Sequence, residues 1–586
     1  MAKKLYAQSF SKGYTIKIFK DTTGAVGAPL EFITASWEVA YDAQDAYSPG
    51  IVPSRFQINA VIDSNLDAIY IESILKDADG IFYMELYKGL SKEWAGTVSP
   101  SACTVEVVNG VRFVTILAWD GFFKLDLESS MYVFAGYKSF ILQLSDIFTR
   151  LNLDQIFDGI AVSDTTRRSG NAVTKTFDAL YHTGSVHELF YYDESNTYRT
   201  YREIVNEICV LFGLRMYQDR GYIVFQDFSR INEPVYQFYT MAGAYRAQAS
   251  FTTSQTLNVE TNGVKMFLPA IKNMDIIHLY GSEQFAFQGT LKNVEHNVYV
   301  STVGFSPVYQ LKPGLPLGLY AGDGSTHFDF FDTQFQTLAS FPYDYDDFYE
   351  IEFRLFVVYG TQSTDGSTWG NNLYLSFTEN GHLDAGGLPG VITVNHSINN
   401  YHLPLTPTLG NAEVWLYLEV VQTQGDPLGF TKPKMKYDLR LHGTGQTRTT
   451  YRADNSGRIL GESLSYNTRL GDIPKGTPIT QAIMVTGGTN AADFVESPTG
   501  PTQPLLFITA RRLTQLRAQP QEYYEIDMRG TSRFTHYGLW GNFYYTPISL
   551  NYTWDSCKAT YAQFLLDEVR TNDLTTIEPP LEPQGP

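Results

Sequence analysis

The strongest constraint on the fold is a strict alternation of apolar and charged side chains from Tyr349 to Leu355, within a longer apolar segment that ends at Gly360. Successive side chains of a β-strand point to opposite faces, so this pattern predicts a strand with one buried and one solvated face. Further segments of the same kind are separated by loops rich in Gly, Asn, Thr and Pro; they span residues 373–377, 414–421 and 435–443. The pattern therefore predicts a jelly-roll-like β-sandwich domain over 320–495.

The N-terminal part of the chain also has the pattern of strands. Two β-rich runs flank Asn109-Gly110, and this pair favours a two-residue type I′ hairpin turn because both central residues adopt positive φ. Segments rich in β-branched and aromatic residues recur from Tyr14 onward. We expect an antiparallel β domain over 1–130.

Two amphipathic helices are predicted next. One begins at Ser139 and places its apolar residues on a single stripe. The other has the capping box Thr200-x-x-Glu203 and a natural stop at Gly213. A strand, a tight turn and a second strand follow at once, which predicts an α/β connecting domain over 131–245.

The rest of the chain returns to strands around the sandwich. We assign 246–315 and 500–575 to one further β domain, with a helix before Pro520. The tail 576–586 is rich in proline, so it cannot form a packed element. The predicted fold class is mainly β with minor α.

Charge and cysteine content exclude several classes of protein. The chain has 586 residues, with 43 Lys and Arg against 62 Asp and Glu and a net charge of −19. Affinity for DNA comes from neutralising phosphates with Lys and Arg, so we expect no sequence-specific nucleic-acid binding. No apolar run is long enough for a membrane span, and the first residues lack the apolar core of a secretory signal. The three cysteines are expected to be free thiols of a protein made in a reducing cytoplasm.

The sequence contains no pattern that predicts an enzyme. Nucleophile-elbow, phosphate-loop and zinc-protease motifs are absent, and the ten histidines are scattered. We therefore expect no catalytic residue, no cofactor and no metal site. A glycan hydrolase using acids such as Asp344, Asp346 or Glu350 is the weakest alternative.

Aromatic residues of the sandwich are candidates for contact with a glycan, because flat rings stack on sugar faces. The candidates are Trp369, Tyr374, Trp415 and Tyr417. The alternative is that Trp415 and Tyr417, two residues apart on one strand face, pack in the core.

Three stretches, in this order, resemble the baseplate hub or tail-associated proteins of tailed bacteriophages, of the type found in Bacteroidetes phages. They are Trp94–Pro100 with Leu117–Leu125, the helix and hairpin Tyr201–Phe228, and Ile508–Gly530 with Ser549–Ser556. The resemblance covers roughly 1–300 and 500–575, and the stretch between them is an inserted domain.

The resemblance implies a fold and a role. Hub subunits form trimers in which two tail-tube-like β-barrels per subunit build a ring beneath the tail tube. Here 1–130 is expected to form the first barrel, and 246–315 with 500–575 the second. The inserted sandwich is expected to point outward. Such hubs carry no catalytic residues of their own.

The sequence thus predicts a structural virion protein at the phage tail tip, assembled in the host cytoplasm. Its expected partners are copies of itself in a trimer, tail tube and distal tail proteins, tail fibre or tip proteins, and a host surface glycan. An acidic channel wall would let DNA pass without adhering. The alternative is a carbohydrate-binding or adhesin-like multidomain β protein.

Overall fold

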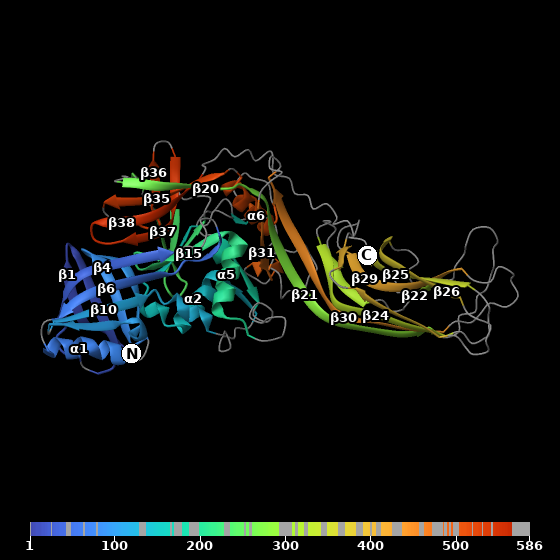
Figure 1. Ribbon diagram of the computed structural model, residues 1–586, viewed down its shortest axis with the longest axis horizontal. Helices are drawn as coiled ribbons and strands as arrows, with labels where there is room; N and C mark the ends of the chain where they lie inside the picture. Colours follow the sequence, from blue (N-terminus) through green and yellow to red (C-terminus); the bar gives the residue numbers. More distant parts are fainter. Residues whose placement is uncertain are drawn as a thin grey trace. The chain divides into compact units, whose positions relative to one another are not determined.

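The computed structural model is mainly β with few helices, which confirms the predicted fold class (Figure 1). Between 280 and 449 only the backbone of the strands is described. The described residues are 2–24, 26–42, 48–62, 65–77, 80–109, 111–127, 136–163, 167–168, 179–186, 198–227, 235–250, 254–256, 261–291, 308–310, 315–320, 326–340, 348–360, 370–382, 391–398, 401–405, 412–424, 436–455, 462–470, 484–485, 489–490, 494–495, 503–518, 520–529, 531–540 and 543–564.

The chain divides into two compact units. Unit 1 comprises Met1–Ile276, Arg452–Asp472 and Thr480–Ile577, and unit 2 comprises Ile277–Tyr451, Ile473–Ile479 and Glu578–Pro586. The chain therefore leaves unit 1, builds most of unit 2 and returns, so that segments far apart in sequence share unit 1. The finer domain boundaries given above stay a prediction.

Unit 1 contains a sheet of fifteen described strands, here called the large sheet. Twelve strands follow one another in hydrogen-bonded order, and β9 (Thr104–Val108), β19 (Ser254–Thr256) and β36 (Tyr537–Trp540) pair beside this path. The order is β20 (Thr261–Leu268), β35 (Gln521–Arg529), β38 (Ser556–Phe564), β37 (Phe543–Tyr552), β4 (Ile33–Asp42), β6 (Ser54–Ile62), β10 (Val111–Trp119), β8 (Ser91–Val98), β7 (Phe82–Lys88), β2 (Tyr14–Thr22), β1 (Ala2–Ser11) and β3 (Leu30–Glu31).

The prediction of two separate β-barrels is wrong. Strand β37 pairs with β4, with Ser549 opposite Asp42, so the N-terminal and C-terminal strands form one continuous sheet. Its two ends, β20 and β3, do not pair with each other among the described strands. A strand edge accepts any partner with free backbone groups, and the sequence does not reveal that the partner of β4 lies about 500 residues further along the chain.

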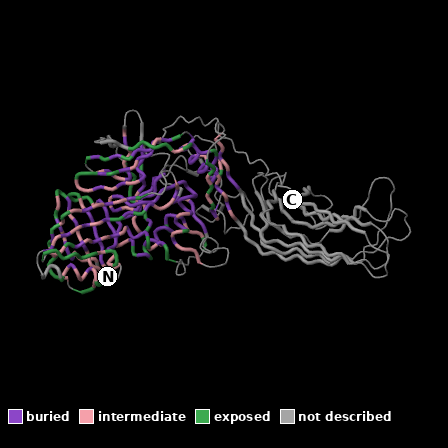
Figure 2. Tube along the Cα trace, in the orientation of Figure 1, coloured by how far each residue is buried: buried purple, intermediate pink, exposed green. Residues whose placement is uncertain are grey.

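Alternation along the strands builds the core of the large sheet. Buried residues alternate with more exposed ones along β6 and along the first half of β2. In Figure 2, buried and more exposed segments alternate along the strands near the N-terminus. The buried rings of Trp37, Phe56 and Trp94 lie in edge-on or tilted contact, with centroids 6.0 and 5.3 Å apart. Such arrangements suit the ring quadrupoles and bury large apolar areas.

Unit 1 contains a second sheet with helices, here called the α/β layer. Its sheet has the order β18 (Tyr245–Ser250), β17 (Val235–Tyr239), β12 (Gly159–Ser163), β16 (Tyr222–Asp227), β15 (Leu214–Asp219) and β5 (Gly50–Ile51). The layer also includes α2 (Phe140–Arg150) and α5 (Tyr201–Phe212).

The two helices of this layer begin where the sequence predicts. Ser139 precedes α2, and Thr200 and Glu203 form the predicted capping box of α5. Gly213 ends α5 in the left-handed conformation, with φ of 64°. Helix α6 (Leu505–Leu516) also matches its prediction, whereas α1 (Asn65–Lys76) lies in a segment for which only strands were expected.

Short elements complete unit 1. They are η1 (Pro100–Ala102), η2 (Phe122–Asp126), η3 (Leu153–Gln155), α3 (Ala179–His182), β11 (Tyr137–Ser139), β13 (Arg167–Arg168), β14 (Thr183–Val186), β31 (Glu462–Thr468), β32 (Met484–Val485), β33 (Thr489–Asn490) and β34 (Phe494–Val495). Cys209 and Cys557 are buried and Cys103 is partly exposed, and none of the three is in a disulfide, as predicted.

Unit 2 consists of strands in two sheets. One contains, in order, β27 (Val391–Ile398), β24 (Thr326–Ser340), β30 (Lys436–Asp454) and β21 (Ile271–Leu291), with β28 (Tyr401–Leu405) beside β24. The other contains β22 (Val308–Gln310), β29 (Ala412–Gln424), β25 (Phe348–Gly360) and β26 (Gly370–His382), with β23 (Leu315–Tyr320) beside β29. Strands β25, β26 and β29 pair antiparallel, as their alternation suggests.

Candidate functional site

The motif segments of the first 130 residues meet where the large sheet contacts the α/β layer. Strand β8 carries Trp94 and Gly96, and it pairs with β10 through Trp119 opposite Thr97. A Cβ on Gly96 would lie 2.2 Å from the carbonyl oxygen of Trp119 and from the Trp94 ring. Only glycine fits this approach, so the motif's glycine is required for packing.

Asp120 anchors the end of β10 to the start of β6. Its Oδ2 accepts hydrogen bonds from the Ser54 amide (2.6 Å) and the Ser54 hydroxyl (3.1 Å), and its Oδ1 accepts one from the Phe122 amide (3.0 Å). Burial raises the pKa of Asp120 to about 7, although these hydrogen bonds favour the charged form. Both oxygens of the carboxyl group therefore accept hydrogen bonds inside the protein.

Gln218 of β15 extends this network into the α/β layer. Its side-chain Nε2 donates to the Ser54 hydroxyl (2.8 Å), and its Oε1 accepts from the Ala95 amide (3.0 Å). The Trp94 indole also donates to the Ser54 hydroxyl, at 3.0 Å. We call this buried set the polar joint; it consists of Ser54, Trp94, Ala95, Asp120 and Gln218. It connects three strands of one layer to a strand of the other.

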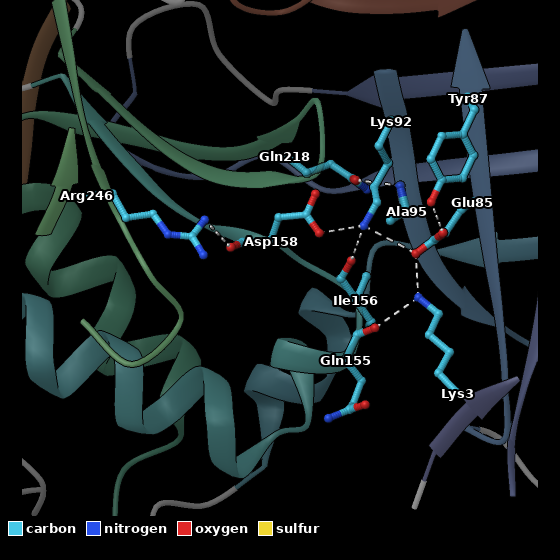
Figure 3. Close-up of polar contacts among 10 residues, drawn as sticks. All are labelled: Lys3, Glu85, Tyr87, Lys92, Ala95, Gln155, Ile156, Asp158, Gln218 and Arg246. Carbon is cyan, nitrogen blue, oxygen red and sulfur yellow. Dashed lines mark hydrogen bonds and ion pairs between the residues drawn. The ribbon is translucent and has the colours of Figure 1, made fainter. Parts of the chain in front are cut away.

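A second link between the layers is formed by charged side chains (Figure 3). Glu85 of β7 is buried between Lys3 of β1 and Lys92 of β8, and Lys92 continues to Asp158 at 2.8 Å. Tyr87 donates to the second oxygen of Glu85 at 2.5 Å. We call Lys3, Glu85, Lys92 and Asp158 the lysine clamp.

Backbone groups of the α/β layer complete the lysine clamp. Lys3 donates to the Gln155 carbonyl at 3.0 Å, and the Asp158 amide donates to the Gly221 carbonyl at 2.7 Å. Burial alone would raise the pKa of Glu85, but Lys3 and Lys92 hold it below its ordinary value. Burial lowers the pKa of Lys3 despite its contact with Glu85. The clamp is therefore an ion-pair chain between two layers.

A third set of contacts holds the C-terminal strands. Buried Arg215 of β15 donates to the Pro547 carbonyl (3.1 Å) and to the Thr546 hydroxyl (3.2 Å), and its guanidinium lies 4.8 Å from the centre of the Phe534 ring. Arg533 pairs with Glu93 at 2.5 Å. These contacts lock segments more than 300 residues apart in the chain.

Buried ionisable groups adjoin these contacts. Thr535 donates to Asp219, and burial lowers the pKa of His536 to about 4 against the attraction of Asp219. Burial raises the pKa of Glu93, and the charge of Arg533 partly offsets this rise. His536 is therefore neutral at physiological pH, and the arrangement is that of a packed polar core.

Unit 1 also contains a cavity of about 1120 Å³. Its lining includes residues paired across adjacent strands of the large sheet, with Asp42 opposite Ser549, Ser549 opposite Thr560 and Thr560 opposite Glu525. Arg202 and other residues of α5 line it as well. The lining mixes acidic, basic and neutral groups. Among the residues whose side chains are described, no three His, Cys, Asp or Glu are grouped to hold a metal ion.

The predicted glycan contacts lie in or near unit 2. Trp369 falls outside the described residues, and for Tyr374 in β26 and for Trp415 and Tyr417 in β29 only the backbone is described. Trp415 pairs with Val358 and Tyr417 with Phe356, so both occupy one face of β29. Strand β25 separates β29 from β26. The glycan contact stays a prediction.

The acids of the hydrolase alternative are similarly placed. Asp344 and Asp346 lie outside the described residues, and Glu350 is in β25, for which only the backbone is described. None of the helices in the described part of the chain is long and apolar enough to cross a membrane.

Most residues of the polar joint and the lysine clamp have no signature in the sequence. Ser54, Gln218 and Glu85 belong to no recognisable motif, because a polar residue on a strand is normally solvent-facing. The available signal was the glycine in each of two motifs, Trp94-x-Gly96 and Asp120-Gly121, because glycine allows close backbone packing.

Comparisons with known proteins give tail proteins among the solved structures. A tail protein from Neisseria meningitidis MC58 is aligned over 94% of this chain and 96% of its own, with 7% identity and a TM-score of 0.32. The 43 kDa tail protein of prophage MuSo2 from Shewanella oneidensis is aligned over 42% of this chain and 65% of its own, with 13% identity and a TM-score of 0.24. No family model and no curated protein match the chain.

Proposed function

We propose that this chain is a structural, non-enzymatic protein of a phage tail, and that it forms the trimeric hub at the tail tip. In this role it links the tail tube and distal tail proteins to tip or fibre components. The hub places the chain in the virion after assembly in the host cytoplasm.

One observation carries the proposal: the motif residues behind the hub resemblance serve packing. Trp94, Gly96 and Asp120 lie in or beside the polar joint, where each is buried or in van der Waals contact with the neighbouring strand. Residues with a chemical role would face a cleft or solvent. A joint that fixes two β-rich layers suits a subunit that must transmit load and hold a channel open.

The charge of the chain supports the same role. With a net charge of −19, the surface of a hub channel would repel phosphate, so that DNA passes without adhering. The 15% aromatic content suits a subunit with large interfaces to ring partners, where Tyr, Trp and Phe are enriched.

The domain organisation is part of the proposal. Residues 1–130, 246–315 and 500–575 would face the ring, with 131–245 between them. The sandwich over 320–495 would be an outward insertion for contact with protein or host glycan through Trp369, Tyr374, Trp415 and Tyr417.

Sedimentation and imaging test the hub assignment. The monomer has a mass of 66.0 kDa, so a trimer sediments at three times that mass, alone or with tail-tube protein. In particles that carry an epitope in the tail 576–586, antibody density is expected at the tail tip. A strictly monomeric chain that forms no ring with tube protein would contradict the hub and favour the adhesin alternative.

A further inference from the structure

The two ends of the large sheet differ in how they expose their backbone. At one end, β3 has only two residues. At the other, β20 has eight residues and, within the described part of the chain, pairs on one side alone, with β35. Short edge strands protect a sheet from unwanted pairing, and long ones do not. The β20 edge therefore needs a cover.

The side chains of β20 also indicate a covered edge. Val264 is 54% exposed, Met266 42% and Phe267 64%. Val264 and Met266 point to one face of the strand and Phe267 to the other. A long strand with apolar side chains on both faces and a free hydrogen-bonding edge is an aggregation site unless another strand binds it.

The chain leaves the large sheet close to this edge. Met266 pairs with Tyr523, and Tyr523 pairs with Ala562, so β20, β35 and β38 are aligned in one row. Both β20 and β38 run antiparallel to β35, so they run parallel to each other and end on the same side. Strand β38 ends at Phe564, two residues beyond that row.

We propose that residues 565–577 of the same chain turn back and add an antiparallel strand to the free edge of β20. Passing from β38 to the far side of β20 takes three strand spacings, about 14 Å, or roughly five extended residues. The remaining 570–577 then match the eight residues of β20. This inference is independent of the hub proposal.

Composition fits this occupant. Segment 571–577 reads TNDLTTI, with Thr, Leu and Ile that suit a strand, and Pro579 and Pro580 follow it. Lys265, which forms an ion pair with Glu522 of β35 and keeps part of its side chain exposed, is the one charged residue of β20, whereas 565–577 contains three acids and one arginine. Opposite charges across strands are favourable.

Hydrogen exchange tests the proposal in the full chain. Amides of 261–268 are expected to exchange about tenfold or more slowly in the full chain than in a chain that ends at Phe564, while β1 and β2 are unchanged in both. Equal exchange in the two chains would overturn the proposal.

A disulfide tests it without truncation. If five residues make the crossing, Leu574 falls near Val264, so Val264→Cys with Leu574→Cys in a Cys103→Ser background is expected to form an intramolecular bond on oxidation. The matched control is Leu30→Cys with Leu574→Cys, which places one thiol at the opposite edge and is expected to stay reduced. An intermolecular bond, equal cross-linking of the control, or no bond in the test pair would each contradict binding by the chain's own tail.

Discussion

Asp120 and Ser54, 66 residues apart in the chain, are joined twice: the amide and the hydroxyl of Ser54 both donate to one carboxylate oxygen. The Ser54 hydroxyl also accepts from Trp94 and Gln218, so it takes part in three hydrogen bonds. A buried network in which each member is satisfied fixes one packing of the strands. The polar joint thereby fixes how the large sheet packs against the α/β layer.

Replacing Asp120 by Asn should destabilise the protein and change its pH dependence. The amide nitrogen of Asn cannot accept, so one donor is left unpaired at a cost of about 1–3 kcal/mol. The pKa of Asp120 is raised by burial to about 7, so its stabilising contribution is present at low pH and lost as pH rises through 7.

The measurement is thermal unfolding of both proteins between pH 5 and pH 8.5. The difference in melting temperature between the parent and Asp120→Asn should shrink as pH rises. His536 is present in both proteins, so its contribution to the pH dependence is removed by the comparison. Its pKa is lowered to about 4, and its effect on stability has the opposite sign. A difference that is constant across this range would contradict the assignment of the pH effect to Asp120.

Gly96→Ala should prevent the close approach of β8 and β10. The added methyl group would lie 2.2 Å from the Trp119 carbonyl and from the Trp94 ring, and backbone on one side cannot yield. We expect a loss of at least about 3 kcal/mol or failure to fold. Gly27→Ala, where no atom lies within 4 Å, is the matched control and should be neutral. Soluble yield and melting temperature measure both.

Local features of the fold were predictable, and long-range pairings were not. The capping box at Thr200 and Glu203 and the stop at Gly213 are short-range contacts that each leave a sequence signature. The pairing of β37 with β4 leaves none, because backbone hydrogen bonds are the same for every sequence. Helix α1 was missed since its Ile and Tyr residues also favour strands, and their apolar positions are spread around the helix.

In the candidate site, too, local motifs were predictable and long-range contacts were not. Trp94, Gly96 and Asp120 were identified from motifs, but their role depends on Ser54 and Gln218, which reach them only through the tertiary fold. A network of this kind needs coordinates, since its members are single polar residues on different strands.

Glu85→Gln should break the lysine clamp. The substitution leaves Lys3 without its carboxylate partner and Lys92 with Asp158 alone, which we expect to cost about 3–5 kcal/mol at pH 7. The pKa of Glu85 is lowered in the folded state by the two lysines against burial, so its contribution is present above pH 4.5 and lost as pH falls below it.

Unfolding at pH 7 and at pH 3.5 checks this. The parent should be more stable than Glu85→Gln at pH 7, with the difference reduced at pH 3.5. Asp77→Asn is the control, because its pair with Lys20 is partly exposed and should contribute less than about 1 kcal/mol. Equal effects of the two substitutions would show that burial of the clamp has no energetic role.

Arg215→Lys should loosen the C-terminal strands. A single ammonium group cannot donate to both Pro547 and Thr546 while stacking on Phe534. We expect cleavage of the C-terminal segment in limited proteolysis to become several-fold faster, with fragments identified by mass spectrometry. Arg55→Lys, at an exposed position, is the control and should be cut at the parental rate. Unchanged cleavage of Arg215→Lys would mean that the strand pairing alone holds this segment.

Ala substitution of Trp415 and Tyr417 separates the two roles that these residues can have. Both lie on one face of β29, which is either a sugar-binding surface or a packing face. As a sugar surface, each ring would stack on a glycan, so both variants should lose binding on a host-polysaccharide array while keeping the parental melting temperature. As core residues, each would instead lower the melting temperature, at a cost of about 3–5 kcal/mol for truncating a large buried aromatic. Val420→Ala, on the opposite face of the same strand, is the matched control for the effect of truncation itself.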